Sequence, residues 1–312
     1  FDCDQLIVEF EDVSEDAADI KMAQDWWILQ DLVDAFPHGL GADKPRPGGN
    51  RFSKEPAYIL ATGNAVALTS EMDPATGRLK GRARIAGPKL SVNLRPEVSK
   101  MLIEGPGNLL LEDNHPVTTR NDESGRGAGG LFGIDEDSGP SNTLIEWDEL
   151  MWYDFSIDQT RFEGNVNLKY FSGAQLARIR GQPIGNSAEV PSGRSTFLTC
   201  DVLTVDFLDR NESYGRPDDS RMGRLSADQL RQFQASGSVM LQDQAEGLWL
   251  TAEDVIYEQQ RKILVIHGTP QRKAHIITQK PGQLPNRVTV ERLFYNLATG
   301  RVELSSPTLN AR

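Results

Sequence analysis

The chain has 312 residues, of which 38% are hydrophobic and 25% are charged, so it can bury a large core as a globular or repeat protein. It contains no run of 18 apolar residues, which argues against a membrane-spanning helix. The formal net charge of −12 argues against nucleic acid as a partner, and against docking on anionic headgroups by charge alone.

The first predicted strand is residues 3–10, CDQLIVEF. Apolar residues two apart place Leu6, Val8 and Phe10 on one face, as in a half-buried strand. Because the sequence begins at Phe1 within what reads as a strand, we expect a processed or truncated product.

Residues 14–36 show the pattern of an amphipathic helix within an insertion at about 11–56. Ser14 is a candidate N-cap, and the apolar stripe of this helix consists of Met22, Trp26, Leu29, Val33 and Phe36. We expect the helix to cover an open end or edge of the sheet. A partner-binding or lipid-gating helix is the alternative.

A glycine phrase follows in ATGNAVAL at 61–68. The same pattern, with an apolar residue two positions before Gly and alternating apolar residues after it, recurs at 103–111, 162–168 and 235–241, with a truncated copy at 265–268. Glycine suits a kink or bulge where φ is positive or backbones approach closely. Each glycine phrase therefore predicts a kinked strand.

The opening phrase also recurs. CDVLTVDF at 200–207 repeats it most closely and places Leu203, Val205 and Phe207 on one face, and looser copies lie at 87–94, 147–154, 252–258 and 290–297. The two phrases alternate along the chain, which is typical of a stack in which each unit packs on its neighbours. If the copies stack in order, Cys3 and Cys200 lie too far apart to form a disulfide.

Two further segments leave a choice. Residues 112–142 read as a flexible Gly-rich acidic loop, in which Asp135, Asp137 and Gly139 only faintly resemble a calcium loop. Residues 225–236 fit either a capped helix or a strand, and we favour a strand because a glycine phrase follows directly.

These elements predict an all-β fold: an elongated antiparallel sheet of stacked short strands, bent into a trough, with one inserted helix. Residues 1–111 form one repeat unit, 112–142 an inserted loop, and 143–312 a second unit that continues the same sheet.

The alternating phrases resemble the repeats of the OstA-like family of lipopolysaccharide-transport proteins, most closely in AEDVIYEQQRKILVIHG (252–268) and FEGNVNL (162–168). The resemblance implies a β-jellyroll or trough whose apolar interior holds lipid or lipopolysaccharide acyl chains, in the periplasm or cell envelope. It also implies end-to-end stacking with itself or with similar proteins.

An apolar trough binds acyl chains by burial. We expect its lining at matched apolar positions of the two phrases: Leu6, Val8, Phe10, Val166, Leu168, Leu203, Val205, Phe207, Val239, Leu241, Leu264 and Ile266.

We expect no catalysis, cofactor or metal, because the four histidines lack metal-ligand spacing and no nucleophile elbow occurs. One alternative is a structural envelope scaffold or fibre with a filled core. Another is a carbohydrate-processing enzyme that uses a ladder of acids at the starts of the repeats: Asp4, Asp148, Asp201, Glu253 and Glu291. Such a ladder of like charges would be costly without cations or Lys/Arg partners.

Overall fold

The computed structural model describes residues 3–12, 54–114, 140–172, 195–207, 230–279, 282, 284–305 and 308–309, except 73–75, 96–97, 246, 297–298 and 300. These residues contain strands and no α-helix, and 17 strands form one sheet. The strands are β1 (Gln5–Asp12), β2 (Lys54–Met72), β3 (Leu79–Asn93), β4 (Lys100–Glu104), β5 (Gly107–Asp113), β6 (Ser141–Trp147), β7 (Leu150–Asp154), β8 (Gln159–Ser172), β9 (Ser195–Phe207), β10 (Leu230–Asp243), β11 (Leu248–Glu258), β12 (Ile263–His267), β13 (Ala274–Thr278), β14 (Asn286–Val290), β15 (Arg292–Asn296), β16 (Arg301–Ser305) and β17 (Thr308–Leu309).

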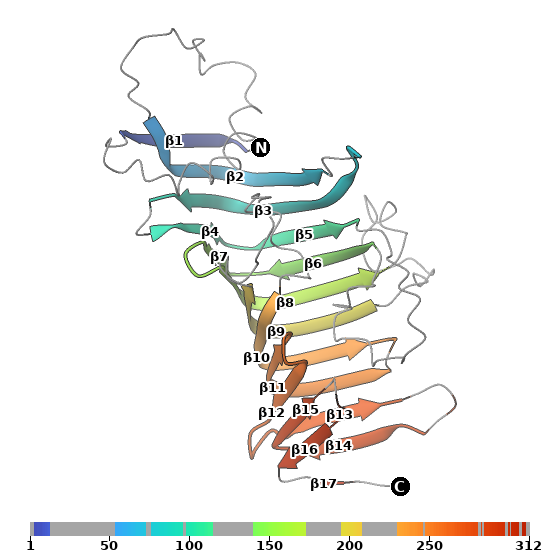
Figure 1. The fold of residues 1–312 in the computed structure, drawn as a ribbon. Coiled ribbons are helices and arrows are strands. Elements are labelled where there is room, and N and C mark those ends of the chain that lie inside the picture. The colour runs from blue at the N-terminus through green and yellow to red at the C-terminus, as the bar shows by residue number, and fades with distance from the viewer. Residues whose placement is uncertain are drawn as a thin grey trace.

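The sheet has two arms, because its long strands pair with different short strands at their two ends. β3, for example, pairs with β4 through residues 89–93 and with β5 through residues 81–86. We call arm A the part built from β1, β4, β7, β12, β15 and β16 with the adjoining halves of the long strands. Arm B is the part built from β5, β6, β13, β14 and β17 with the other halves (Figure 1). Every pairing is antiparallel, and β3, β4, β7, β8, β6 and β5 pair in a closed ring of six strands.

The arms meet at a corner formed by the glycine phrases. Between Ser236 and Val239 the β10 strand carries one residue more than its partner β11, which is the two-against-one count of a β-bulge. Gly237 lies there at φ +76°. Three of the five predicted kinks are therefore bulges, in the long strands β2, β8 and β10. The other two predictions of a kinked strand are wrong: at 103–111 the chain leaves β4 and enters β5, and at 265–268 β12 ends at His267.

The two repeated phrases meet at this corner, since the acid of one phrase covers the glycine of the other. A Cβ on Gly63 would collide with Asp4 Oδ2, and a Cβ on Gly237 would collide with Asp201 Oδ2. Glycine is required because any side chain there would collide with the neighbouring acid. The phrases alternate in the sequence because they are neighbours in the sheet.

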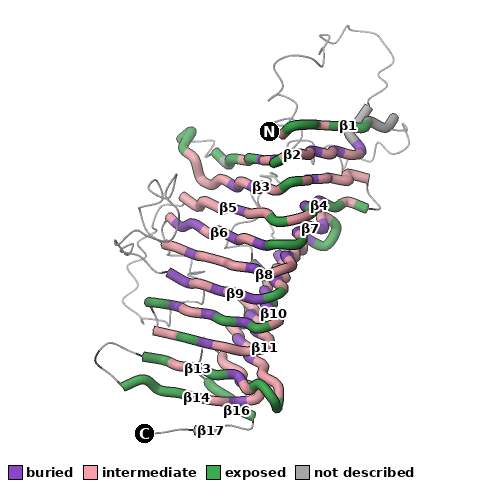
Figure 2. The backbone as a smooth tube through the Cα atoms, turned by 180° about the vertical axis from the view of Figure 1, so that it is seen from behind, coloured by how far each residue is buried: buried purple, intermediate pink, exposed green. Residues whose placement is uncertain are grey.

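A single hydrophobic core runs along the inner side of both arms, from Ala61 in β2 to Leu293 in β15. Buried residues recur in every second position of most strands, which is the alternation expected of a sheet with one covered face (Figure 2).

The structure confirms strands at all six copies of the opening phrase and at all the glycine phrases. The segment 225–236 is a strand from Leu230 onward. The loop predicted at 112–142 is shorter, since β5 continues to Asp113 and β6 begins at Ser141 because their backbones pair with each other. The helix predicted at 14–36 and the faint calcium loop at Asp135 and Asp137 lie outside the described residues.

The stack follows the chain order, and Cys3 and Cys200 are both free thiols, as predicted. From β1 to β9 there are six strand steps, or about 29 Å at ~4.8 Å per strand, well beyond the ~7 Å reach of a disulfide.

Candidate lipid-binding interior

The inner face of arm A carries an unbroken row of apolar side chains across twelve strands. Each member lies opposite the next in the register, and from β2 to β15 all are at most 8% exposed. The row is Leu6, Ala61, Leu90, Ile103, Met151, Phe162, Leu203, Ala235, Val255, Ile266, Leu293 and Leu304.

Arm B carries a matching row across ten strands. Its members are Ala67, Ile85, Leu109, Ile145, Leu168, Leu198, Leu241, Leu250, Ile276 and Val288. Residues of both rows belong to the same core cluster, so the two arms line one common interior.

The residues predicted to line a trough lie on these inner faces. Six are in the buried core, as is Phe207: Val166, Leu203, Val239, Leu241, Leu264 and Ile266. Leu6, Leu168 and Val205 pack against that core while partly exposed, and Val8 is half-buried. The side chain of Phe10 lies outside the described residues, although its backbone is in β1.

Aromatic side chains are the part of the interior that the sequence analysis missed. Trp147 and Phe162 meet at the corner with ring centroids 5.3 Å apart, and Phe233 and Tyr257 pair at 5.5 Å. The Trp147 indole N–H donates to the Gly105 carbonyl at 3.1 Å. Phe162 and Tyr257 stand in the quoted phrases FEGNVNL and AEDVIYE, so their position in the repeat was the available signal.

Polar groups appear toward the far rim of each arm. In arm A the Tyr153 hydroxyl donates to Asp158 at 2.9 Å, next to the hairpin between β7 and β8. In arm B the Thr196 hydroxyl donates to the buried Asp243 at 3.2 Å. The interior therefore changes from apolar at the corner to polar at the rims.

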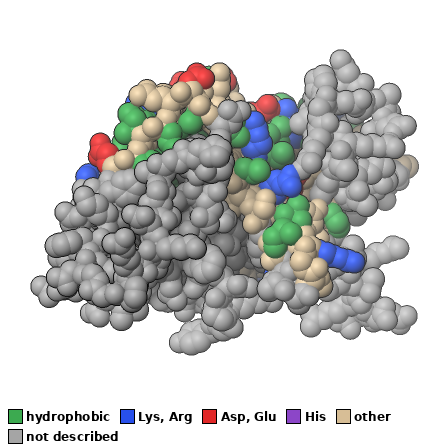
Figure 3. Space-filling view, turned by 90° about the horizontal axis from the view of Figure 1, so that it is seen from above, with side chains coloured by type: hydrophobic (Ala, Val, Ile, Leu, Met, Phe, Trp, Pro, Cys, Tyr) green, Lys and Arg blue, Asp and Glu red, His purple; other side chains and the backbone are tan. Residues whose placement is uncertain are grey.

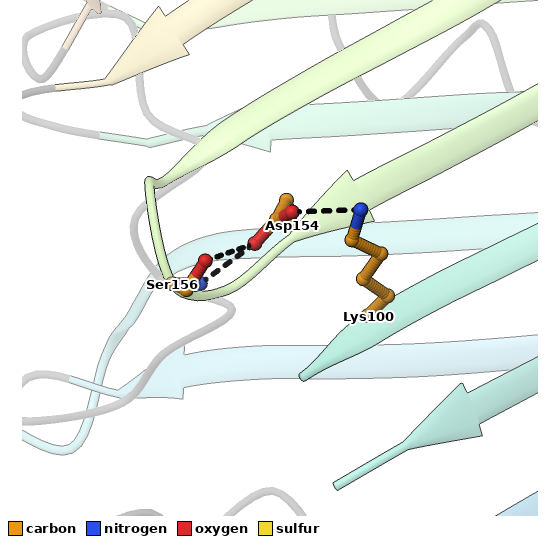
Figure 4. A network of polar contacts seen from close by, with 3 residues as sticks. All are labelled: Lys100, Asp154 and Ser156. Atoms are coloured by element: carbon orange, nitrogen blue, oxygen red, sulfur yellow. Dashed lines mark hydrogen bonds and ion pairs between the residues drawn. The ribbon is translucent and has the colours of Figure 1, made fainter. Parts of the chain in front are cut away.

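The same hairpin holds a second polar group on the outer side of arm A, shown in Figure 4. Lys100 Nζ lies 3.0 Å from one oxygen of Asp154, and the other oxygen accepts from the Ser156 backbone N–H at 3.0 Å and the Ser156 hydroxyl at 2.5 Å. Burial alone raises the pKa of Asp154, but these hydrogen bonds outweigh it and hold the pKa below its ordinary value.

The two ends of the apolar rows differ from the middle. In the last strand of arm A the inward residues Val302 and Leu304 are 51% and 38% exposed, because no further strand in the described part of the chain pairs beyond β16. At the β1 end, seen along the stack, hydrophobic side chains reach the surface among acidic and basic ones (Figure 3).

Three acids of the proposed ladder contact the bulges at the corner. Asp4, Asp148 and Asp201 lie exposed on the outer side of the corner; Asp4 and Asp201 cover a neighbouring glycine, and Asp148 accepts from Asn165 Nδ2 at 2.8 Å. These contacts are structural ones at the bulges. Within the described ranges, no three His, Cys, Asp or Glu side chains lie close enough together to hold a metal ion.

Among the described residues, no helix is long and apolar enough to cross a membrane. The chain matches no protein-family model and no curated protein sequence.

Proposed function

We propose that this protein is a non-catalytic lipid carrier of the cell envelope, in which the two arms form a jellyroll-like trough for acyl chains of lipid or lipopolysaccharide. The observation that carries the proposal is the pair of apolar rows that run along the whole stack. Twelve strands at ~4.8 Å give an apolar path about 50 Å long.

Length and polarity both support an amphiphilic cargo. Burying each methylene is worth about 0.8 kcal/mol, so a chain of about twelve carbons could gain roughly 9 kcal/mol before the costs of binding. The polar pairs toward the rims, Tyr153–Asp158 and Thr196–Asp243, are themselves buried, so a headgroup would reach them only where the arms open. A path open at both ends suits passage along the protein, in the periplasm or envelope.

The sheet edges support stacking with a second trough-shaped protein or another copy. Among the described residues of arm A, β1 and β16 each pair with one strand, so the other edge of each can accept a further strand. Arm A has twelve strands, and each runs antiparallel to the next. Its last strand, β16, therefore runs in the opposite direction to its first strand, β1. A copy stacked end to end would thus place its β1 antiparallel to β16 and continue both sheet and path.

A structural scaffold with a filled core is the second candidate. Its support is the burial of the inner side chains, since Ala61, Phe162, Leu203 and Leu241 are at most 1% exposed. If the arms stay closed at this density, no room remains for an acyl chain. A carrier must open the arms or bind where the lining is partly exposed.

Photo-crosslinking would decide between the two. A photoreactive phenylalanine analogue placed at Leu168 or at Val205 is on the inner face at a partly exposed position. The adjacent Lys169 and Thr204 point to the outer face and are matched controls. We expect a co-purifying amphiphile to crosslink from the inner positions alone.

Native mass spectrometry of the same preparations would identify the adduct. A protein that carries no amphiphile and crosslinks to none from either inner position is the scaffold. Aspartate at Leu241 or Leu264 would be a poor test, because these side chains are 0% and 3% exposed and a charge there would unfold the sheet.

A further inference from the structure

On the outer face of arm A, three neighbouring strands near the C-terminal end carry apolar residues in one row. One outward row reads Arg161, Thr204 and Gln234 on β8, β9 and β10, and then Ile256, Val265 and Phe294 on β11, β12 and β15. The next strand returns to a charge with Glu303. We call Ile256, Val265 and Phe294, with Ile263 beside them on β12, the outer patch.

The strands of the outer patch are apolar on both faces. In ILVI of β12 the inward Leu264 and Ile266 are buried in the core, while Ile263 and Val265 are half-buried on the outside. Strands with near-continuous apolar runs are typical of sheets covered on both sides. The same outward row is polar or charged on β3, β8, β9, β10 and β16, and it is apolar again at Ile7, Leu60, Leu102 and Trp152 on β1, β2, β4 and β7.

Two charges of opposite sign flank the outer patch. Asp254 on β11 and Arg292 on β15 both pair with His267 on the central strand β12, one on each side. Neither forms an ion pair with any residue of the described part. They are therefore about 10 Å apart, two strand spacings, and too distant to neutralise each other.

This pattern is self-complementary. A two-fold axis along β12 would bring β11 of one copy over β15 of the other. Asp254 would then face Arg292 of the second copy, Ile256 would face its Phe294, and Val265 would meet its own equivalent. Each contact occurs twice, as a closed isologous interface demands.

We propose that the outer patch is the contact surface of a face-to-face homodimer. The contact surface would span five strands, β10, β11, β12, β15 and β16, and three rows of residues. Its dimensions are therefore about 20 Å by 14 Å. That area is well below the ~800 Å² per partner of a standard interface, so the dimer is weak and forms at high concentration. It uses the sheet face and is independent of the end-to-end edges.

Sedimentation velocity over a wide concentration range tests the dimer. We expect the wild-type chain to shift from monomer to dimer, Val265→Asp to remain monomeric, and Thr204→Asp, the control in the same outward row, to dimerise normally. Because both changes lie on the outer face, thermal unfolding should show that each variant still folds.

The opposite charges of Asp254 and Arg292 allow a second test of the dimer. Asp254→Arg or Arg292→Asp alone should raise the dimer dissociation constant at least tenfold, since like charges then face each other twice. The double variant should restore it. A monomer at all concentrations, assemblies larger than two, or a dimer that survives Val265→Asp would overturn the proposal.

Discussion

At the scale of single residues, each bulge contains two consecutive residues with positive φ. The first is a glycine, and the second is an asparagine or a serine. Asn64, Asn165 and Ser238 lie at φ +53°, +45° and +49°. Asparagine tolerates this region better than serine because its side chain stabilises the left-handed backbone locally. The repeat phrase GN is therefore explained by backbone geometry.

Ser238→Asn should stabilise the protein by about 0.5 kcal/mol, and Asn165→Ser should destabilise it by about 1 kcal/mol, because it also loses the hydrogen bond to Asp148. Urea unfolding measures both changes. Ser236→Asn, at a strand position outside the left-handed region, is the matched control. A gain for Ser236→Asn equal to that of Ser238→Asn would contradict the explanation.

Cys200 should be inert in the folded protein. Burial, followed by the neighbouring Asp201, raises the pKa of its thiol to about 12. At pH 8 only about one molecule in ten thousand carries the reactive thiolate. We expect at most one thiol, that of the half-buried Cys3, to react with a thiol reagent in the native state, and two to react in denaturant without reductant. Two fast-reacting native thiols would show that the core around Cys200 opens.

At the scale of the element, the hairpin between β7 and β8 depends on ionised Asp154, which is 7% exposed. Asp154→Asn should lower the free energy of unfolding at pH 7 by about 1–3 kcal/mol, because it weakens the bonds to Lys100 and Ser156. Since the folded pKa lies below the unfolded value, this stability is present above the unfolded pKa of about 3.9 and is lost as the pH falls through the folded pKa.

The measurement is the difference in unfolding free energy between wild type and Asp154→Asn across pH 2–7. It should be constant above about pH 5 and shrink below pH 4. Ser156→Ala removes one hydroxyl bond and should show a smaller difference with the same pH profile. A difference that does not change with pH would mean that the carboxylate charge is not what holds the turn.

The strands were predictable because local alternation in phrases such as CDVLTVDF survives in the fold, and the glycine kinks because glycine marks positive φ. The division into two arms was not. It depends on which short strand pairs with each half of β3 or β11, and those contacts join residues far apart in the sequence. For the interior, the sequence located the apolar lining, but the closeness of packing around Phe162 and Leu241 depends on the distance between the arms.

At the scale of the whole molecule, the stack should open from its ends. β9 and β10 are paired along both edges, whereas within the described ranges β1 and β16 pair with one strand each, and every residue of β16 is exposed. In a stack where each strand depends on its neighbours, terminal strands open at lower free energy than central ones.

Hydrogen exchange followed by mass spectrometry should therefore show rapid exchange in β16 and β1, and the slowest exchange in β8 to β11. Leu304→Lys, which removes an exposed apolar contact at the end, should speed exchange in β16 and β15 and leave β9 unchanged, because β9 lies five strands away. Uniform exchange along the sheet, accelerated everywhere by this substitution, would mean that the arms unfold as one cooperative unit. The interior could then admit a cargo only through its open ends, because no part of the path would open separately.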